Sequence, residues 1–560
     1  MKLRRAGTAG CVHCQGPPHD RRFLNVSARA LFAGVALLAL AAPLLADAPG
    51  VYAIVGGTVH PVSGPELTNG AVIIRDGLIE AVGSAVVIPP DATIIDAKGK
   101  HVYPGLIDAQ TSLGFPSGTP RARGRGAGAR PQSAATEQLP ETSPAFVAMR
   151  EAKLSDDDVD AKRATGVTTI LTAPSFGIFN GQSVVLDLGG GTMEQRVVRG
   201  SVAQQISFNP RPAWTYPDSL MGVISYIRQS MFDAQQSAAA HAIYDKSPAG
   251  NQRPAESAAM TALGGVLRRE VPVVFIADSE LMMRRAMAIA REYNLKYILS
   301  GARQAYRKSA DLKDVPLLVS VKWPVAPTAK EDREEQPLRL IRERQLAPTS
   351  PSALQKSGAL YALVSGPGKT GDFLPGIRKA IDNGLSADDA LRAVTLSPAR
   401  ILGLDRQLGS LDKGKIANVV VTDKPIFDKE AKVQRVYVDG REMKLPTEED
   451  RARGRRGAGE AGPLDGSWSL IVKASNGDVN INARFHVEDG QVTGSFSGDR
   501  GSGDIRGGTF DGTTLEFTIN VKGQAEQEDW VFHGTLSGTA ISGTVSTTLG
   551  TLPFSGSKSK

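Results

Sequence analysis

Cysteine is almost absent from this sequence of 560 residues. Its two cysteines, Cys11 and Cys14, form a single Cys-x-x-Cys close to the N-terminus. Both precede an apolar run that is typical of a cleaved leader, and they would be removed with it. The mature chain then has no disulfide and no thiolate metal ligand, so its stability and chemistry must come from other groups.

Histidine is scarce as well, and its positions matter more than its number. The sequence has seven His, of which only His241 lies between residues 104 and 404. A metal centre that needs several imidazole ligands cannot be built there from one side chain. His241 stands in an Ala/Gln/Ser-rich stretch, which favours a surface or packing role over general-base catalysis.

Three common catalytic and nucleotide-binding motifs are missing. The sequence has no Gly-x-Ser-x-Gly elbow, so nothing local supports a hydrolase-type serine nucleophile. Residues 365–370 are similar to a phosphate loop, but its first glycine would fall on Leu363. The glycine run at 189–191 is not continued by the spacing of a dinucleotide fingerprint.

The first 48 residues have the composition of a secretory signal peptide. Basic residues precede an uncharged apolar run from Ala30 to Ala46, and Ala46-Asp47-Ala48 offers a small-x-small cleavage site. The alternative is a membrane anchor, but the run has 17 residues, fewer than the roughly 20 of a spanning helix. We therefore predict a bacterial periplasmic or secreted protein with no stable membrane anchor after cleavage.

The formal net charge of +7 is modest for this length, and much of the excess lies in two Arg/Gly-rich segments. These segments are 116–146, with Arg121 to Arg130, and 445–463, with Arg451 to Arg456. Such segments can bind nucleic acid. In an exported protein a solvated linker is the favoured interpretation, so we predict no nucleic-acid partner.

Strand patterns occupy both ends of the chain. From Val51 to Val102 short apolar runs alternate with Asn-Gly, Asp-Gly and Lys-Gly turns, and similar runs return at Gly409 to Asp423 and Val433 to Gly440. These two groups predict the halves of one discontinuous β-sandwich. From Asp465 to Lys560, short strands separated by glycine predict an antiparallel barrel or sandwich.

Between the two halves, apolar runs alternate with helical segments, which is typical of parallel βα units. Seven such runs are the expected strands: 106–109, 167–172, 184–188, 271–276, 296–299, 316–321 and 360–364. The expected helices carry caps, including a capping box from Ser386 to Asp389.

Several separate motifs together resemble one known family. They are Val102 to Gly114, with its Pro-Gly-Leu-Ile-Asp core, Gly166-Val-Thr-Thr169, the Gly181-Gln182 turn, and Asn383 to Gly403 followed by Gly409 to Asp423. In this order they resemble the amidohydrolase superfamily, in its imidazolonepropionase-like branch. The Gly-Thr and Gly-Ser strand starts near the C-terminus resemble a lipocalin-like module found on secreted hydrolases; it would either hold a ligand or serve as a structural appendage.

The resemblance implies an α/β fold: a (β/α)8 TIM-type barrel with a discontinuous β-sandwich, followed by an all-β barrel-like domain. It also implies hydrolysis of non-peptide C–N bonds with zinc or another divalent metal. The expected domains are the signal peptide 1–48, the first half of the β-sandwich at 49–103, the barrel 104–404, the second half of the β-sandwich at 405–444, the linker 445–463 and the last domain 464–560.

The positions where the family holds its metal have lost their ligands here. The His-x-His after the first strand is replaced by Gln110 and Ser112, and the positions after the fifth, sixth and eighth strands hold Ala277, Gly301 and Gly366. Neutral oxygens and missing side chains do not replace imidazole and carboxylate ligands. We therefore expect no metal or other cofactor, and no conventional metal-hydroxide hydrolysis.

Two hypotheses of function follow from this loss. In one, the chain is inactive and keeps its pocket for a small-molecule ligand or as a scaffold. In the other, a carboxylate at Asp278 supports catalysis without the usual metal, although Asp278 or Ser279 is also expected to cap the next helix. Other charged residues expected near strand ends are Glu280, Lys322, Lys369 and Asp372. Homo-oligomers are compatible with both hypotheses.

Overall fold

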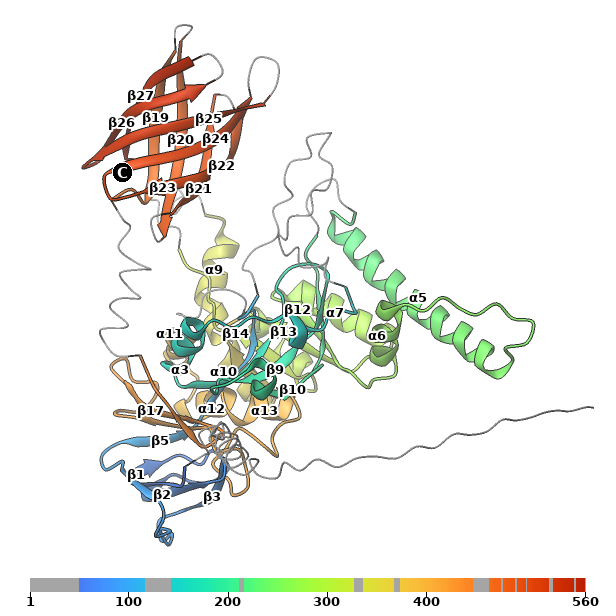
Figure 1. Ribbon diagram of the computed structural model, residues 1–560. Coiled ribbons are helices and arrows are strands. Elements are labelled where there is room, and N and C mark those ends of the chain that lie inside the picture. Colours follow the sequence, from blue (N-terminus) through green and yellow to red (C-terminus); the bar gives the residue numbers. More distant parts are fainter. Residues whose placement is uncertain are drawn as a thin grey trace, which may run out of the picture.

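The computed structural model describes residues 50–115, 143–210, 216–326, 336–366, 373–446, 463–474, 477–488, 491–499, 501–522, 527–547 and 550–558. The expected leader, the arginines of both Arg/Gly-rich segments, Lys369 and Asp372 lie outside these residues. The described elements form an N-terminal sheet, a mixed α/β region and an all-β C-terminal region (Figure 1). Within these ranges, no helix has the length and apolar character needed to cross a membrane.

The N-terminal sheet is built from two distant segments of the chain. Its eight strands follow the order β18-β17-β16-β5-β1-β2-β3, with β4 paired to β1. The antiparallel pairing of β5 with β16, in which Val102 faces Val421, joins the segments. The strands are β1 (Tyr52–Val59), β2 (Leu67–Arg75), β3 (Leu78–Gly83), β4 (Thr93–Asp96), β5 (His101–Pro104), β16 (Val419–Thr422), β17 (Val433–Val438) and β18 (Arg441–Met443).

The middle region contains two sheets, a smaller one in which two of the three strand pairs are antiparallel and a larger one in which four of the five are parallel. One has the order β10-β9-β7-β6 and the other β15-β14-β13-β12-β11-β8. Their strands are β6 (Leu106–Thr111), β7 (Val167–Thr172), β8 (Phe179–Gln182), β9 (Val184–Asp187), β10 (Val197–Arg199), β11 (Gln204–Ser207), β12 (Val273–Ala277), β13 (Tyr297–Gly301), β14 (Leu317–Ser320) and β15 (Tyr361–Val364).

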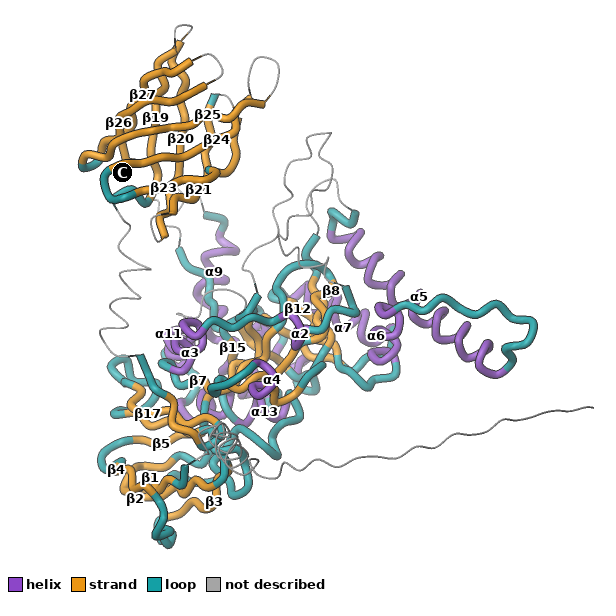
Figure 2. The backbone as a smooth tube through the Cα atoms, in the orientation of Figure 1, coloured by secondary structure: helices purple, strands orange, loops and turns teal. Residues whose placement is uncertain are grey.

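Helices accompany these strands in the middle region, whereas the C-terminal region is drawn with strands and loops alone (Figure 2). The predicted cap at Ser386 is confirmed, because its hydroxyl accepts the backbone N–H of Asp389 at 3.1 Å. The helices are α2 (Ala148–Glu151), α3 (Asp156–Arg163), α4 (Met193–Arg196), α5 (Leu220–Lys246), α6 (Ala258–Leu267), α7 (Glu280–Glu292), α9 (Leu338–Leu346), α10 (Ser350–Ser357), α11 (Phe373–Ile381), α12 (Ala387–Ala393) and α13 (Leu396–Ile401).

Apart from β10, the strands of both middle sheets are largely buried on their two faces. Side chains at alternate positions, such as Ile298 and Leu318, share one core cluster that draws on both sheets. The intervening positions, such as Leu299 and Val319, belong to the larger cluster that includes the helices. Because neighbouring residues of a strand point to opposite faces, the first cluster fills the space that the sheets enclose.

The third expected strand, residues 184–188, does not follow the predicted alternation of parallel strands and helices. Residues 184–188 do form a strand, β9, but β9 runs antiparallel to β7, and β8 runs antiparallel to β11. Only residues 173–178 separate β7 from β8. A parallel connection needs a crossover of a dozen residues or more, so this short connection forces the chain to turn back.

A buried ion pair holds the seam between the first and last strands. The ammonium of Lys162, on α3, lies 2.5 Å from Oδ2 of Asp108, on β6, and both side chains are almost completely buried. The same carboxylate accepts the backbone N–H of Ser365 at 3.0 Å and its hydroxyl at 2.5 Å. The backbone N–H of Gly366 also donates to the backbone carbonyl of Gln110 at 3.0 Å. One carboxylate therefore ties β6, α3 and the end of β15 together.

A second buried carboxylate connects the middle region with the N-terminal sheet. Asp187, on β9, accepts the hydroxyl of Thr169 at 2.5 Å and the amide of Asn418 at 3.2 Å. The side-chain Oδ1 of Asn418 in turn accepts the backbone N–H of Asp439 at 3.0 Å. Complete burial raises the pKa of Asp187 to about 7, because an ionised carboxylate is poorly solvated there.

The C-terminal region is a closed antiparallel barrel of eight strands. The sheet order β20-β19-β27-β26-β25-β24-β23-β21 closes through a β20–β21 pairing, and β22 is added to β21. The strands β22, β23 and β27 were not predicted. The strands are β19 (Gly466–Ala474), β20 (Gly477–Glu488), β21 (Gln491–Gly498), β22 (Gly501–Asp504), β23 (Arg506–Phe510), β24 (Thr514–Lys522), β25 (Gln527–Ser537), β26 (Ala540–Thr547) and β27 (Gly550–Lys558).

Aromatic side chains pack inside this barrel. The rings of Phe517 and Phe532 stack at 4.6 Å, and Phe485 and Phe554 meet them edge-on at 5.0 and 4.9 Å. Trp468 is buried and donates its indole N–H to the Leu464 carbonyl at 2.7 Å. An interior filled by its own side chains favours a structural appendage over a ligand container.

Candidate functional site

The positions expected from the sequence meet along one edge of the middle sheets. Gln110 lies near the end of β6, and its backbone carbonyl accepts the backbone N–H of Gly366, just after β15. Ala277 and Gly301 are direct partners at the ends of β12 and β13. These are the carboxyl ends of the strands, where barrel enzymes build their sites.

At two of these positions, Ala277 and Gly301, the inward-facing side chain belongs to the neighbouring residue, because side chains alternate between the two faces of a strand. Ala277 packs in the core shared with the helices, whereas Ile298 lies in the enclosed core. Since alternate residues share a face, Asp278 and Ser300 are the inward residues at the ends of β12 and β13. Ser320 holds the corresponding place on β14.

Two carboxamides meet across the enclosed space. Nε2 of Gln110 donates to Oε1 of Gln205, on β11, at 3.3 Å, although β6 and β11 are not paired strands. Gln110 is 4% exposed and Gln205 is 0% exposed. Oε1 of Gln110 and Nε2 of Gln205 remain buried without a hydrogen-bond partner among the described residues. A buried polar atom without a partner is costly, and it indicates a place for a ligand or a water.

The hydrogen-bonding capacity of this pair does not depend on how the amides are oriented. Turning both amides exchanges the roles of Gln110 and Gln205. In either arrangement one bond joins the two side chains, and one carbonyl oxygen and one amide NH2 group remain without a partner among the described residues. The Gln110–Gln205 pair therefore offers an acceptor beside a donor, which is the complement of another amide group.

Backbone geometry explains both glycines at the edge. Gly301 has φ +93°, and a Cβ there would collide with Oδ1 of Asp278. Gly366 has φ +73°, and a Cβ there would lie 3.0 Å from Oγ of Ser320. Only glycine adopts positive φ without strain. A metal-binding side chain at either place would need a different local backbone.

Ser112, the second of the replaced His positions, is also close to fully buried, with 6% exposure. Its carbonyl accepts the backbone N–H of Phe115 at 3.1 Å, which begins the turn after β6. Together with Ser300 and Ser320, it adds neutral hydroxyl oxygen to this edge. None of these groups carries the charge or the imidazole nitrogen that a catalytic zinc ion requires.

Asp278 is held by a neighbouring cation. Nη2 of Arg303 lies 2.9 Å from Oδ2 of Asp278, and the aspartate side chain is 48% exposed. Of the two predicted caps for α7, Asp278 and Ser279, the structure uses Ser279, whose hydroxyl accepts the N–H of Met282. Glu280 instead pairs with Arg284 at 3.0 Å.

His241 and the remaining acidic groups add no metal-binding side chain at the ends of these strands. His241 lies on α5, where its Nδ1 contacts the Ser237 carbonyl at 2.8 Å and its Nε2 lies 3.6 Å from Glu256. Within the described residues of the chain, no three His, Cys, Asp or Glu side chains are grouped so that they could hold a metal ion.

Fold and edge together define a class: an α/β protein with a polar site at the carboxyl ends of parallel strands. Residues 349–443 match the model of the Amidohydrolase family. Imidazolonepropionase from Pseudomonas aeruginosa (strain UCBPP-PA14) is 27% identical over 389 residues, which cover 64% of this chain and 88% of that protein. The chain belongs to the amidohydrolase superfamily.

Two further similarities are consistent with this family. N-substituted formamide deformylase from Arthrobacter pascens is 40% identical over 65 residues, 10% of this chain and 12% of that protein. The crystal structure of an amidohydrolase from Thermotoga maritima MSB8 has a TM-score of 0.58 and 24% identity, and the match covers 70% of this chain and 100% of that chain. The structural likeness supports the fold and says nothing about the substrate.

Sequence reasoning missed Gln205 because it missed β11. The segment Gln204–Ser207 reads Gln-Gln-Ile-Ser, which lacks the apolar run of the other strands. One signal was present, because seven expected strands cannot complete an eightfold barrel. Asp108, Lys162 and Ser365 were also missed, since two charged groups 54 residues apart give no local pattern.

Proposed function

We propose that this chain is an exported amidohydrolase-superfamily protein that binds a small amide ligand at the edge of a (β/α)8-type barrel and does not use the conventional metal-hydroxide mechanism. The observation that carries the proposal is the Gln110–Gln205 pair at the place where the family holds its metal. Export rests on the sequence of residues 1–48, which predicts a periplasmic or secreted location.

The side chains at this edge argue against hydrolysis by a metal-bound hydroxide. In that chemistry the metal lowers the pKa of bound water from about 15.7 to about 7 and is held by imidazoles and carboxylates. Here the inward groups are two carboxamides, hydroxyls and one carboxylate that already pairs with Arg303.

The free acceptor and donor of the Gln110–Gln205 pair suit one edge of an amide. A ligand amide that presents N–H and C=O on the same side can bond to both at once. Open-chain secondary amides are almost always trans, whereas a ring fixes the cis form. Small cyclic amides are therefore the ligand class that the pair favours.

Titration calorimetry of the tag-free mature protein with 2-pyrrolidone and hydantoin tests this proposal. We expect saturable binding of about one ligand per chain, weakened roughly tenfold or more in Gln110→Leu, because a buried hydrogen bond is worth about 1–3 kcal/mol when its partner is left unsatisfied. Gln355→Ala, an exposed glutamine on α10, is the matched control. Equal binding by Gln110→Leu would contradict the proposal.

Elemental analysis of the same preparation tests the absence of the metal-hydroxide mechanism. We expect far less than one zinc, manganese or iron per chain. About one metal per chain, with chelator-sensitive turnover of amides, would instead indicate that an unconventional metal site performs the family's hydrolysis.

A second candidate function is metal-independent hydrolysis that uses Asp278. It is favoured by the position of the Asp278 carboxylate at the inward end of β12, next to Gly301. Turnover of a cyclic-amide panel that survives chelator and is lost in Asp278→Asn would support it. Unchanged turnover in that variant would remove Asp278 from the mechanism.

A further inference from the structure

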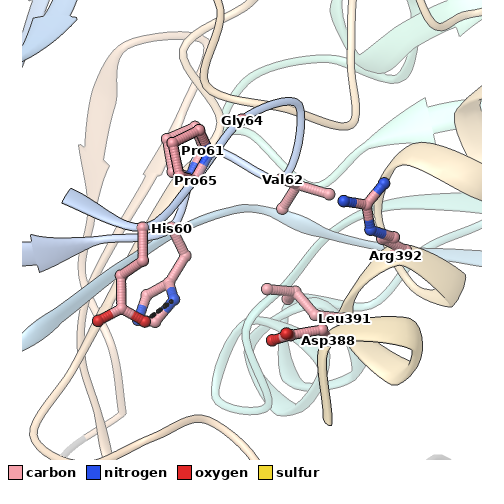
Figure 3. Close-up of a pocket in the computed structure, with 9 residues that line it drawn as sticks. His60, Pro61, Val62, Gly64, Pro65, Asp388, Leu391 and Arg392 are labelled. Carbon is pink, nitrogen blue, oxygen red and sulfur yellow. Dashed lines mark ion pairs between the residues drawn. The ribbon is translucent and has the colours of Figure 1, made fainter. Parts of the chain in front are cut away.

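A cleft outside the middle sheets joins the N-terminal sheet to helix α12. One wall is the loop that follows β1, and the other is α12 (Figure 3). The cleft has a volume of about 290 Å³. This lies just below the range of about 300–1,000 Å³ that is usual for ligand pockets, so only a small molecule fits. It is lined by His60, Pro61, Val62, Gly64, Pro65, Glu66, Asp388, Leu391 and Arg392.

His60 is fixed on both of its nitrogens. Its Nδ1 lies 3.3 Å from Glu66, and its Nε2 lies 3.1 Å from Nδ1 of His101. Its ring stacks on Tyr103 at 4.3 Å with an angle of 7°. Burial lowers the pKa of His60, so the ring is neutral at pH 7 and the charge of Glu66 is not cancelled.

Two charged residues of α12 face the cleft without partners. Asp388 and Arg392 are exposed, and neither side chain has a hydrogen bond or ion pair among the described residues. They are four residues apart on one helix, a spacing at which opposite charges commonly pair. The two side chains nevertheless do not pair with each other. With Glu66, the cleft therefore presents one guanidinium and two carboxylates.

Apolar groups separate these charges. In Figure 3, Val62 and Leu391 lie between His60 on one side and Arg392 on the other. Val62 is 6% exposed and has φ +70°. A β-branched residue in the left-handed region is strained and persists only where the surroundings fix it. The loop thus keeps an apolar side chain at the cleft at the cost of strain.

We propose that this cleft binds a small zwitterion, an α-amino acid with a branched apolar side chain. Its carboxylate pairs with Arg392, its ammonium lies near Glu66 and Asp388, and its side chain packs on Val62 and Leu391. The three parts match the cleft in charge and polarity. This site is separate from the Gln110–Gln205 pair and does not depend on the function proposed for that edge.

Titration calorimetry of the full mature chain with three ligands tests the assignment. They are L-leucine, N-acetyl-L-leucine, which lacks the ammonium, and L-leucinamide, which lacks the carboxylate. We expect leucine to bind with one site per chain, and each analogue to bind about tenfold or more weakly, because each loses one charge-assisted contact. Equal binding of all three, tighter binding of leucinamide, or no saturable binding would overturn the proposal.

Variants assign the contacts. Arg392→Gln should weaken leucine about tenfold or more and leave leucinamide unchanged, since leucinamide has no carboxylate for Arg392. Asp388→Asn should weaken both ligands and leave N-acetyl-leucine unchanged. Arg342→Gln, an exposed arginine on α9, is the matched control and should bind leucine like the wild type. Thermal unfolding verifies that each variant is folded, and unchanged leucine binding by Arg392→Gln would overturn the proposal.

Discussion

At the scale of single residues, the most informative group is the buried carboxylate of Asp187. It has two kinds of donor, the Thr169 hydroxyl and the Asn418 amide, and no cation among the hydrogen bonds and ion pairs of the described residues. Burial without a counter-charge favours the protonated form, which explains the pKa of about 7. The protonation state of Asp187 therefore affects the stability of the contact between the middle region and the N-terminal sheet.

The stability of the protein should fall as the pH rises through the titration of Asp187. The folded pKa of about 7 exceeds the unfolded value of about 3.9, so between these pH values the folded state binds more protons. Stability then decreases from about pH 4 to pH 7, by an upper limit on the order of 4 kcal/mol, and changes no further above pH 7.

Urea unfolding of the wild type and Asp187→Asn, at pH 5 and pH 8, measures this effect. The asparagine cannot ionise, so we expect a smaller loss of stability at pH 8 for the variant than for the wild type. Asp405→Asn should behave like the wild type. The same pH dependence in wild type and Asp187→Asn would contradict the assignment.

At the scale of elements, the Asp108 seam replaces a regular strand ladder. Asp108 contacts Lys162 on α3 and Ser365 after β15, so three elements depend on one carboxylate. The ion pair is almost completely buried. Removing one partner from such a pair leaves an uncompensated charge, whereas removing both is much less harmful.

Lys162→Met should destabilise the protein by about 3–5 kcal/mol. The double variant Lys162→Met/Asp108→Asn should be less destabilised than the single one, because it leaves no isolated charge. Chemical unfolding of both measures the difference, with the exposed Lys313→Met as the control. A loss below about 1 kcal/mol for Lys162→Met, the size expected for a surface pair, would argue against the seam.

At the scale of the whole molecule, the C-terminal barrel has a core of its own. Its buried side chains form one cluster from Leu464 to Phe554, distinct from the clusters of the middle region and the N-terminal sheet. A closed sheet also leaves few strand edges to be covered by other elements. We therefore expect this barrel to unfold independently.

Calorimetric scans of the full mature chain should resolve at least two transitions. Phe532→Ala, in the barrel core, should lower only one of them, since truncating a buried Phe costs about 3–5 kcal/mol. Phe275→Ala, in the core of the middle region, should lower another. A single transition that moves with both variants would mean that the barrel and the middle region unfold together.

Much of the architecture was predicted from local patterns in the sequence. Apolar runs, turns and caps depend on nearby residues, and they identified the family, most strands of the middle region and the antiparallel character of the C-terminal domain. Sequence order also placed Gln110, Ser112, Ala277, Gly301 and Gly366 near the ends of their strands, whereas the loss of metal ligands at these positions remains a prediction. The leader and the lipocalin-like resemblance remain predictions.

Tertiary structure alone decided the rest, because the deciding groups are distant in sequence. Only the fold places Gln205 across from Gln110, 95 residues apart, and Lys162 against Asp108. It also sets the inward face of each strand, which makes Asp278 and Ser300 the side chains at the ends of β12 and β13. Sequence determined which groups are present; their burial, partners and direction arise only when the two middle sheets pack on a shared core.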